Sequence, residues 1–228
     1  MNFSTKPNRR ETLWGGIYLI LYMSVLPRLV PIAVALLAPG LDAVWTNFIF
    51  FSVNFLAAVV IFRRLLLHSL GDAVKGPGRT LCCALLGYFG SQLLGNYVGA
   101  FIYRIDPNFA NVNNEVVYSL VAENFLLMGI GAVILAPIAE ELLFRGLVFR
   151  ILYDRSPPAA HLVSMALFSF IHITGYLGRY EPKLLLLCFI QYLPSAYCLN
   201  FTYRHSGTII APILTHMLIN LAALFAMR

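Results

Sequence analysis

The sequence predicts an all-α protein, a polytopic transmembrane helical bundle of about seven or eight helices. Its 228 residues are 60% hydrophobic and only 11% charged, with a mean hydropathy of +0.78. An average soluble domain is about 25% charged, so this composition favours a membrane protein. Apolar runs of roughly 17 to 25 residues, enough to cross a bilayer, recur along the chain. We therefore expect one integral membrane domain over residues 1–228, with no segment left for a soluble domain.

Seven apolar runs define the expected spans. They cover residues 12–37, 46–62, 80–103, 116–136 with an extension to about 153, 158–177, 183–203 and 207–227. If Pro27, Arg28 and Pro31 divide the first run, the count becomes eight. Turn-forming residues in 67–79 and 106–114 mark the clearest connections between spans.

The first run follows three basic residues, Lys6, Arg9 and Arg10, and so resembles a signal peptide. However, it continues past Val25 without a small-residue cleavage site, which favours an uncleaved first span. Further along, the pair Pro157-Pro158 marks a helix start, because proline suits the first helical turn.

Basic residues gather at alternate span ends. On the same side as the N-terminus lie Arg63, Arg64, Lys75, Arg79, Arg150, Arg155 and Arg204. The positive-inside rule therefore places the N-terminus in the cytoplasm, and seven spans put the C-terminus outside, whereas a divided first span reverses one end. The net charge of +6 is explained by these span ends and indicates no nucleic-acid partner. We expect membrane lipids to surround a multi-pass protein of the cell membrane.

The four cysteines lie inside apolar spans and form no Cys-x-x-Cys pair. They are Cys82, Cys83, Cys188 and Cys198. Such thiols usually pack as small hydrophobic side chains, so we expect all four to be free.

Three charged residues, Glu140, Glu141 and Arg145, lie inside the apolar stretch 134–146. An ionised side chain at bilayer depth costs roughly 2.5 to 3.5 kcal/mol, so these charges need pairing, hydration or a function. Glu141 and Arg145 are four residues apart on a helix and are expected to form an ion pair. Glu140 is rotated by about 100° and points elsewhere, which suits a group that takes a proton from water. The alternative is a structural cluster in which both glutamates share Arg145.

Two later helices carry further polar residues at depth. His172 follows Phe168 by one turn, and His216 precedes Asn220 by one turn. Taken separately, the first pattern is compatible with a core histidine and the second with an interhelical hydrogen bond. Together with a free carboxylate, these groups supply a base for water and donors for a developing oxyanion, which is the inventory of a hydrolytic site.

The order Glu-Glu-x-x-x-Arg, Phe-x-x-x-His and His-x-x-x-Asn on successive helices resembles the CAAX prenyl protease and bacteriocin-processing (CPBP) family. These intramembrane endopeptidases include the type II CAAX prenyl endopeptidases. The resemblance covers roughly residues 120–225 and implies a protease core at about 116–227. The first 115 residues match only as generic membrane helices.

The resemblance implies a role for each matching residue. Glu140 is the expected general base and His172 the residue that orients the water, while His216 and Asn220 stabilise the oxyanion. The residues expected to shape the site, with less direct roles, are Glu141, Arg145 and Phe168.

The same residues leave the question of a metal open. Glu140, His172 and His216 are also a ligand set that zinc accepts. The chain lacks a His-Glu-x-x-His helix, and Asn220 beside His216 is a poor zinc ligand but a good oxyanion donor. We therefore favour a mechanism without a cofactor and keep zinc as the alternative.

The expected function is hydrolysis of a peptide bond in a membrane-associated protein or peptide. A prenylated CAAX-type tail and a bacteriocin-type peptide both remain open as substrates. Two other functions are considered: a proton-coupled transporter, and a non-enzymatic immunity or membrane partner protein. Polar residues at depth also serve proton pathways, but internal repeats, common in transporters, are not evident.

Overall fold

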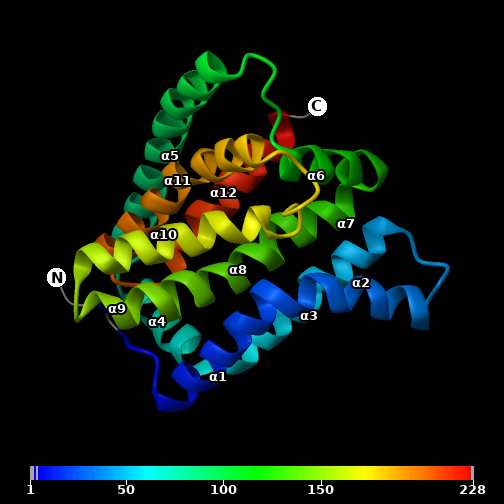
Figure 1. Ribbon diagram of the computed structural model, residues 1–228. Helices are drawn as coiled ribbons and strands as arrows, with labels where there is room; N and C mark the ends of the chain where they lie inside the picture. Colours follow the sequence, from blue (N-terminus) through cyan, green and yellow to red (C-terminus); the bar gives the residue numbers. More distant parts are fainter. Residues whose placement is uncertain (1–2, 4, 227–228) are drawn as a thin grey trace.

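The computed structural model describes residue 3 and residues 5–226, which form an all-α helical bundle (Figure 1). The described part contains no strand, so the predicted fold class is confirmed. The helices are α1 (Arg9–Ile20), α2 (Leu26–Leu37), α3 (Ala43–Ile61), α4 (Arg63–Lys75), α5 (Pro77–Ile105), α6 (Val112–Glu123), α7 (Phe125–Gly129), α8 (Ala136–Glu141), α9 (Arg150–Tyr153), α10 (Pro157–Thr174), α11 (Pro182–Ser206) and α12 (Ile210–Ala226). Three π-helical segments join some of them into longer rods: Leu21–Val25, Ile130–Leu135 and Leu142–Phe149.

In the described part, five continuous helices are long and apolar enough to cross a bilayer. They are Arg9–Leu37, Ala43–Ile61, Phe125–Tyr153, Pro157–Thr174 and Pro182–Ser206. The chain is therefore an integral multi-pass membrane protein. The count is below the seven or eight spans predicted, because α5 is long but less apolar and α12 is apolar but has only 17 residues.

One expected span boundary was wrong. The run predicted at 116–153 is two helices, because the backbone of Asn124 is extended and its Oδ1 accepts a hydrogen bond from the Leu127 N–H at 3.1 Å. This cap ends α6 and starts α7. The first run is one continuous helix, Arg9–Leu37, as the count of seven spans assumes, so the alternative in which Pro27, Arg28 and Pro31 divide it does not apply.

Two of the π-helical segments, Leu21–Val25 and Ile130–Leu135, end two residues before a proline, Pro27 and Pro137. In both, the N–H of the residue before the proline bonds to the carbonyl five residues back. Proline has no N–H, and its ring clashes with the carbonyl four residues back in a regular α-helix. The wider π turn, with its i→i+5 bonds, accommodates the proline without ending the helix.

The rod Phe125–Tyr153 lies at the centre of the bundle. Figure 1 shows α8 and α9 between α10 on one side and α1 with α3 on the other, in agreement with the contacts of these helices. On the far side, α11 packs between α10 and α5. A glycine, Gly87, allows α5 to approach closely, because a Cβ there would collide with Thr202 of α11 and press on Thr215 of α12. The glutamate-bearing helix α8 is therefore enclosed.

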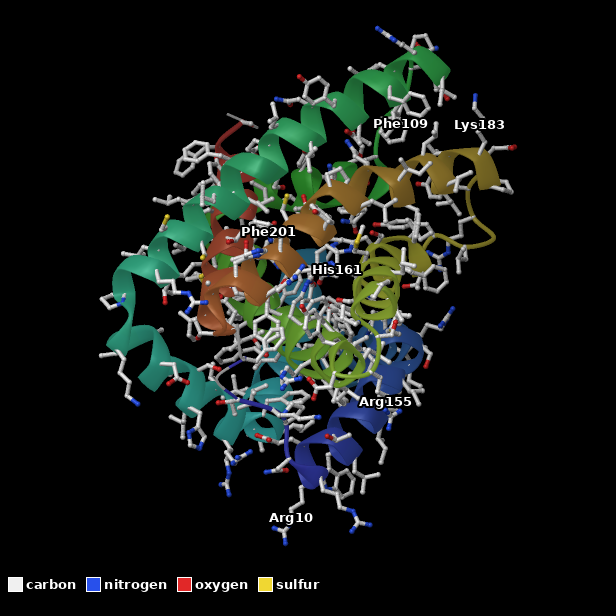
Figure 2. All side chains as sticks on the ribbon, turned by 90° about the vertical axis from the view of Figure 1, so that its left-hand side faces the viewer. Arg10, Phe109, Arg155, His161, Lys183 and Phe201 are labelled. Atoms are coloured by element: carbon white, nitrogen blue, oxygen red, sulfur yellow. The ribbon has the colours of Figure 1, made fainter. Side chains whose placement is uncertain are left out.

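The two ends of the bundle are held by different contacts. At the end where the chain starts, Lys6 pairs with Asp154. At the other end, Lys183 Nζ lies 3.7 Å from Asp106 Oδ2. Figure 2 shows Lys183 and Arg10 at opposite extremes of the molecule.

The cysteines agree with the prediction that all four are free. Cys188 and Cys198 are buried among apolar side chains, while Cys82 lies exposed on α5. The exposed thiol faces outward from a helix on the periphery of the bundle.

Candidate active site

A cavity with a volume of about 630 Å³ reaches into the bundle between the helices of the N-terminal third and those of the C-terminal half. Its walls come from α2 and α3 on one side and from α6, α8, α10 and α12 on the other. The four residues predicted to be catalytic all line it: Glu140, His172, His216 and Asn220. Residues of three separate sequence motifs therefore line the same cavity.

The Glu141–Arg145 ion pair is present as predicted. Arg145 Nη1 donates to Glu141 Oε1 at 2.9 Å, and both side chains are fully buried. The same carboxylate oxygen also contacts His216, whose Nδ1 lies 2.9 Å from Glu141 Oε1. Glu141 thus joins α8 to α12 as well as to the following π-helical segment.

Three further contacts hold the Arg145 guanidinium. Its Nε donates to Asn200 Oδ1 and its Nη2 to the Ala196 carbonyl, both at 3.1 Å. The guanidinium carbon lies 4.3 Å from the centre of the Phe168 ring, a cation–π contact. Arg145 therefore ties the central rod to α11 and to α10, and it places Phe168 beside the site.

Glu140 has a different environment from its neighbour. Its side chain is largely buried, and Oε1 accepts a hydrogen bond from the Tyr22 hydroxyl at 3.0 Å. Among the described residues, Oε2 has no hydrogen-bond partner. Arg145 acts on Glu140 electrostatically but makes its hydrogen bond to Glu141, so the alternative in which both glutamates share the arginine equally is not what the structure shows.

His172 is held on both sides. Its Nδ1 lies 2.8 Å from the Phe168 carbonyl, and its ring stacks on Tyr192 at 4.1 Å between centroids. The carbonyl accepts only, so the Nδ1 carries the proton and the neutral ring has its acceptor at Nε2. Glu140 is near enough to act on His172 electrostatically.

Asn220 owes its position to the backbone of the central rod. Its Nδ2 donates to the Ala132 carbonyl at 2.8 Å. That carbonyl is available because the Ala136 N–H bonds to Gly131 instead, and because Pro137, the next residue, has no N–H to offer. The amide has a second N–H, which the described contacts leave uncommitted.

Comparison with protein families gives one match. Residues 122–222 match the family model of the Rce1-like type II CAAX prenyl endopeptidases. The family resemblance is confirmed over that segment. The Rce1-like segment contains all seven residues singled out from the sequence, and it supports protease activity of the CAAX type in a lipid environment, with a peptide or protein as substrate. Comparisons with curated proteins and with solved structures gave no match.

Sequence reasoning missed several residues that contact the site. Tyr22 lies outside the Rce1-like segment, in a span whose only charged residue at depth is Arg28. A tyrosine in an apolar helix does not by itself indicate a functional role. Asn200 is fully buried and accepts hydrogen bonds from Arg145 and from Ser164 Oγ. A lone asparagine in the apolar run 183–203 was a signal for such a role.

A zinc ion does not fit the arrangement of the described side chains. Among them, no three His, Cys, Asp or Glu residues are grouped as metal ligands require. We therefore derive no step through a metal bound by Glu140, His172 and His216.

The contacts of Arg145 predict a large loss of stability in the Arg145→Ala variant. Removing one partner of a buried ion pair leaves an uncompensated charge and costs about 3 to 5 kcal/mol. We expect this loss in the free energy of unfolding, measured in detergent micelles by denaturant titration. Arg155→Ala, at an exposed turn, is the matched control and should lose less than about 0.5 kcal/mol. Equal losses for the two variants would contradict the role assigned to Arg145.

Proposed function

We propose that the chain is an intramembrane endopeptidase in which Glu140 activates the water that attacks a peptide bond of a membrane-associated protein or peptide. The observation that carries the proposal is the contrast between adjacent glutamates. Both carboxylates have an Oε2 without a hydrogen-bond partner among the described residues. Glu141, however, is fully buried and paired with Arg145, whereas Glu140 lines the cavity. A free carboxylate beside a polar cavity suits general-base catalysis.

In the first chemical step, two hydrogen-bond acceptors hold the attacking water. A water molecule between Glu140 Oε2 and His172 Nε2 donates one hydrogen to each, which leaves an oxygen lone pair directed at the substrate carbonyl. As the water oxygen attacks the carbonyl carbon, its proton passes to Glu140, and the carbonyl oxygen becomes an oxyanion. Tyr22 fixes the carboxylate through Oε1, and Tyr192 fixes the imidazole by stacking. Holding both acceptors still favours the attacking geometry.

The oxyanion then needs donors. The uncommitted N–H of Asn220 supplies one. His216 supplies a second from Nε2 when both ring nitrogens carry protons, and in that form the ring is an ion-pair partner of Glu141. Glu140 finally gives its proton to the leaving nitrogen as the C–N bond breaks, which yields a carboxylic acid and an amine.

Substrate identity and membrane location belong to the same proposal. A prenylated CAAX-type tail and a bacteriocin-type peptide both contain the bond that this chemistry cleaves. We propose the cell membrane as location, with the N-terminus in the cytoplasm, from the distribution of basic residues. A proton-coupled transporter and a non-enzymatic immunity or membrane partner protein are the functions that the following variant distinguishes from a protease.

The Glu140→Gln variant tests the role of the carboxylate. It keeps the shape of the side chain but removes the base, so we expect peptide cleavage in native membranes to fall by at least about 100-fold with folding intact. Glu123→Gln, an exposed glutamate at the end of α6, is the matched control and should retain full activity.

The neighbouring glutamate gives a contrasting result. Glu141→Ala breaks the buried pair with Arg145, so we expect stability to suffer at least as much as cleavage. If Glu140→Gln leaves cleavage unchanged and alters proton-coupled uptake instead, the transporter is favoured and the protease proposal fails.

Tyr22→Phe tests the positioning of Glu140. Hydrogen bonds to charged groups contribute about 1.5 to 3 kcal/mol, so we expect kcat to fall at least about tenfold with little change in KM. Tyr18→Phe is the matched control, because Tyr18 is buried one turn away and bonds to Asn54. The two variants should lose similar stability, but only Tyr22→Phe should lose kcat. A parallel loss of kcat in both would assign Tyr22 a purely structural role.

Removal of any bound metal tests whether cleavage depends on a metal ion. We expect the purified protein to keep full cleavage activity after exhaustive chelation and to contain no stoichiometric metal by elemental analysis. Activity that disappears on chelation and returns with zinc would overturn the metal-free mechanism while leaving the protease itself in place.

A further inference from the structure

We propose that α4 (Arg63–Lys75) lies in the boundary layer between lipid and water and binds the headgroups of anionic phospholipids there. None of its residues lines the cavity, so this surface is separate from the candidate active site. Three observations support the assignment: the place of α4 in the fold, the three distinct faces of the helix, and the charges at its two ends.

α4 lies across one end of the bundle. It joins the end of α3 to the start of α5, and the far end of α5 leads to Asp106, which contacts Lys183 at the opposite end of the molecule. The 13 residues of α4 have a length of about 20 Å, which is too short to cross the hydrocarbon layer. The helix also carries charged residues at both ends. It therefore turns the chain at the surface of the bilayer.

One face of α4 is attached to the protein. Leu65, Ser69 and Ala73 are buried on this face. The Leu65 N–H donates to Glu11 Oε1 at 2.9 Å, and the Ser69 carbonyl accepts a hydrogen bond from the Thr208 hydroxyl at 2.8 Å. Contacts with α1 and with the turn between α11 and α12 thus fix α4 against the end of the bundle.

The remaining surface of α4 consists of an apolar face and a polar face. Leu67, Leu70 and Val74 are 67%, 43% and 78% exposed, and they lie within an arc of about 60° on the helix. His68 and Lys75 are also exposed and lie about 120° away from that arc. Contact with water is unfavourable for the first face, and contact with hydrocarbon is unfavourable for the second. Amphipathic helices of this kind lie in the membrane plane, where the boundary layer accommodates both faces.

Basic residues flank the apolar face. Arg63 precedes it and Lys75 follows it, about 18 Å apart along the helix axis. Among the described residues Arg63 makes no ion pair, and the exposed Lys75 Nζ lies 3.9 Å from Asp72 Oδ1, at the outer limit of one. Arg64, in contrast, lies 3.6 Å from the buried Glu11 carboxylate and is committed to the protein. Arg63 and Lys75 can therefore extend their charges to phosphate groups while their stems cover apolar surface.

An anionic phospholipid suits both exposed faces at once. Its acyl chains cover the apolar residues, and its headgroup neutralises the basic ones. A zwitterionic headgroup offers the same phosphate together with a positive amine, which opposes the attraction. A soluble acidic partner would neutralise the charges but would leave the apolar face without lipid. Each basic residue near a membrane surface raises the affinity for anionic lipid about fivefold.

Fluorescence quenching by brominated lipids tests the site at a single position. In a background of Trp14→Phe and Trp45→Phe, which removes both native tryptophans, Leu70→Trp reports from the apolar face. In phosphatidylcholine bilayers, we expect brominated phosphatidylglycerol to quench this variant with at least about fivefold higher affinity than brominated phosphatidylcholine. High salt should remove most of the preference, because it screens exposed charges. Phe89→Trp, on the exposed surface of α5, is the matched control and should show no preference.

Charge removal identifies the residues that bind the headgroup. Arg63→Gln and Lys75→Gln should each reduce the preference measured with Leu70→Trp, and the double variant should abolish it. Arg155→Gln is the matched control, because Arg155 is exposed at the same end of the molecule but well apart from α4 (Figure 2). It should keep the full preference. Equal losses in all three single variants would indicate a general attraction by this end of the bundle and would overturn the inference.

Two other results would also overturn it. If both lipids quench Leu70→Trp equally, α4 lies in the boundary layer without a preference for anionic headgroups. If neither lipid quenches it and iodide in the water does, the apolar face is open to water and the helix does not lie on the membrane. If Leu70→Trp fails to fold, Val74→Trp reports from the same face.

Discussion

The buried pair between Glu141 and Arg145 is the interaction on which the rest of the site depends. Two ions in a dry interior are stable together only with good geometry and with further hydrogen bonds around them. Here the guanidinium bonds to the carboxylate, to Asn200 and to a backbone carbonyl, and it stacks on Phe168. These requirements fix α10, α11 and α12 around the central rod, because each must bring a partner to the same pair. The positions of His172 and His216 follow from that arrangement.

Proline supplies a second constraint, through the backbone rather than through charge. Pro137 converts the preceding turn to π-helical bonding and leaves the Ala132 carbonyl without an intrahelical N–H, so Asn220 can bond there. A similar π-helical segment before Pro27 contains Tyr22, the residue that bonds to Glu140. π-helical turns are frequent at functional sites. In this protein they place one side chain on each wall of the cavity without ending either helix.

The sequence predicts the local geometry well and the distant contacts poorly. Spacing of four residues was enough to predict the Glu141–Arg145 pair, because that contact lies within one helix. Spacing says nothing of Tyr22 or Asn200, since their partners come from helices more than 50 residues away. The break at Asn124 was missed because the apolar character of 116–153 hides a capping residue with a strong backbone preference. Periodicity thus finds the candidate residues, and packing decides which of them meet.

The adjacent glutamates meet the same energetic demand in two ways. Each must avoid an unsatisfied negative charge in a medium of low dielectric. Glu141 lowers this cost through Oε1, which contacts a guanidinium and an imidazole, while its fully buried Oε2 has no hydrogen-bond partner among the described residues. Glu140 has only one hydroxyl as a donor, so its second oxygen needs hydration from the cavity. In the proposed mechanism, a water molecule that hydrates this carboxylate is also the nucleophile. The proposal therefore gives the stability of Glu140 and its reactivity towards a peptide bond a common cause, the cavity beside the buried ion pair.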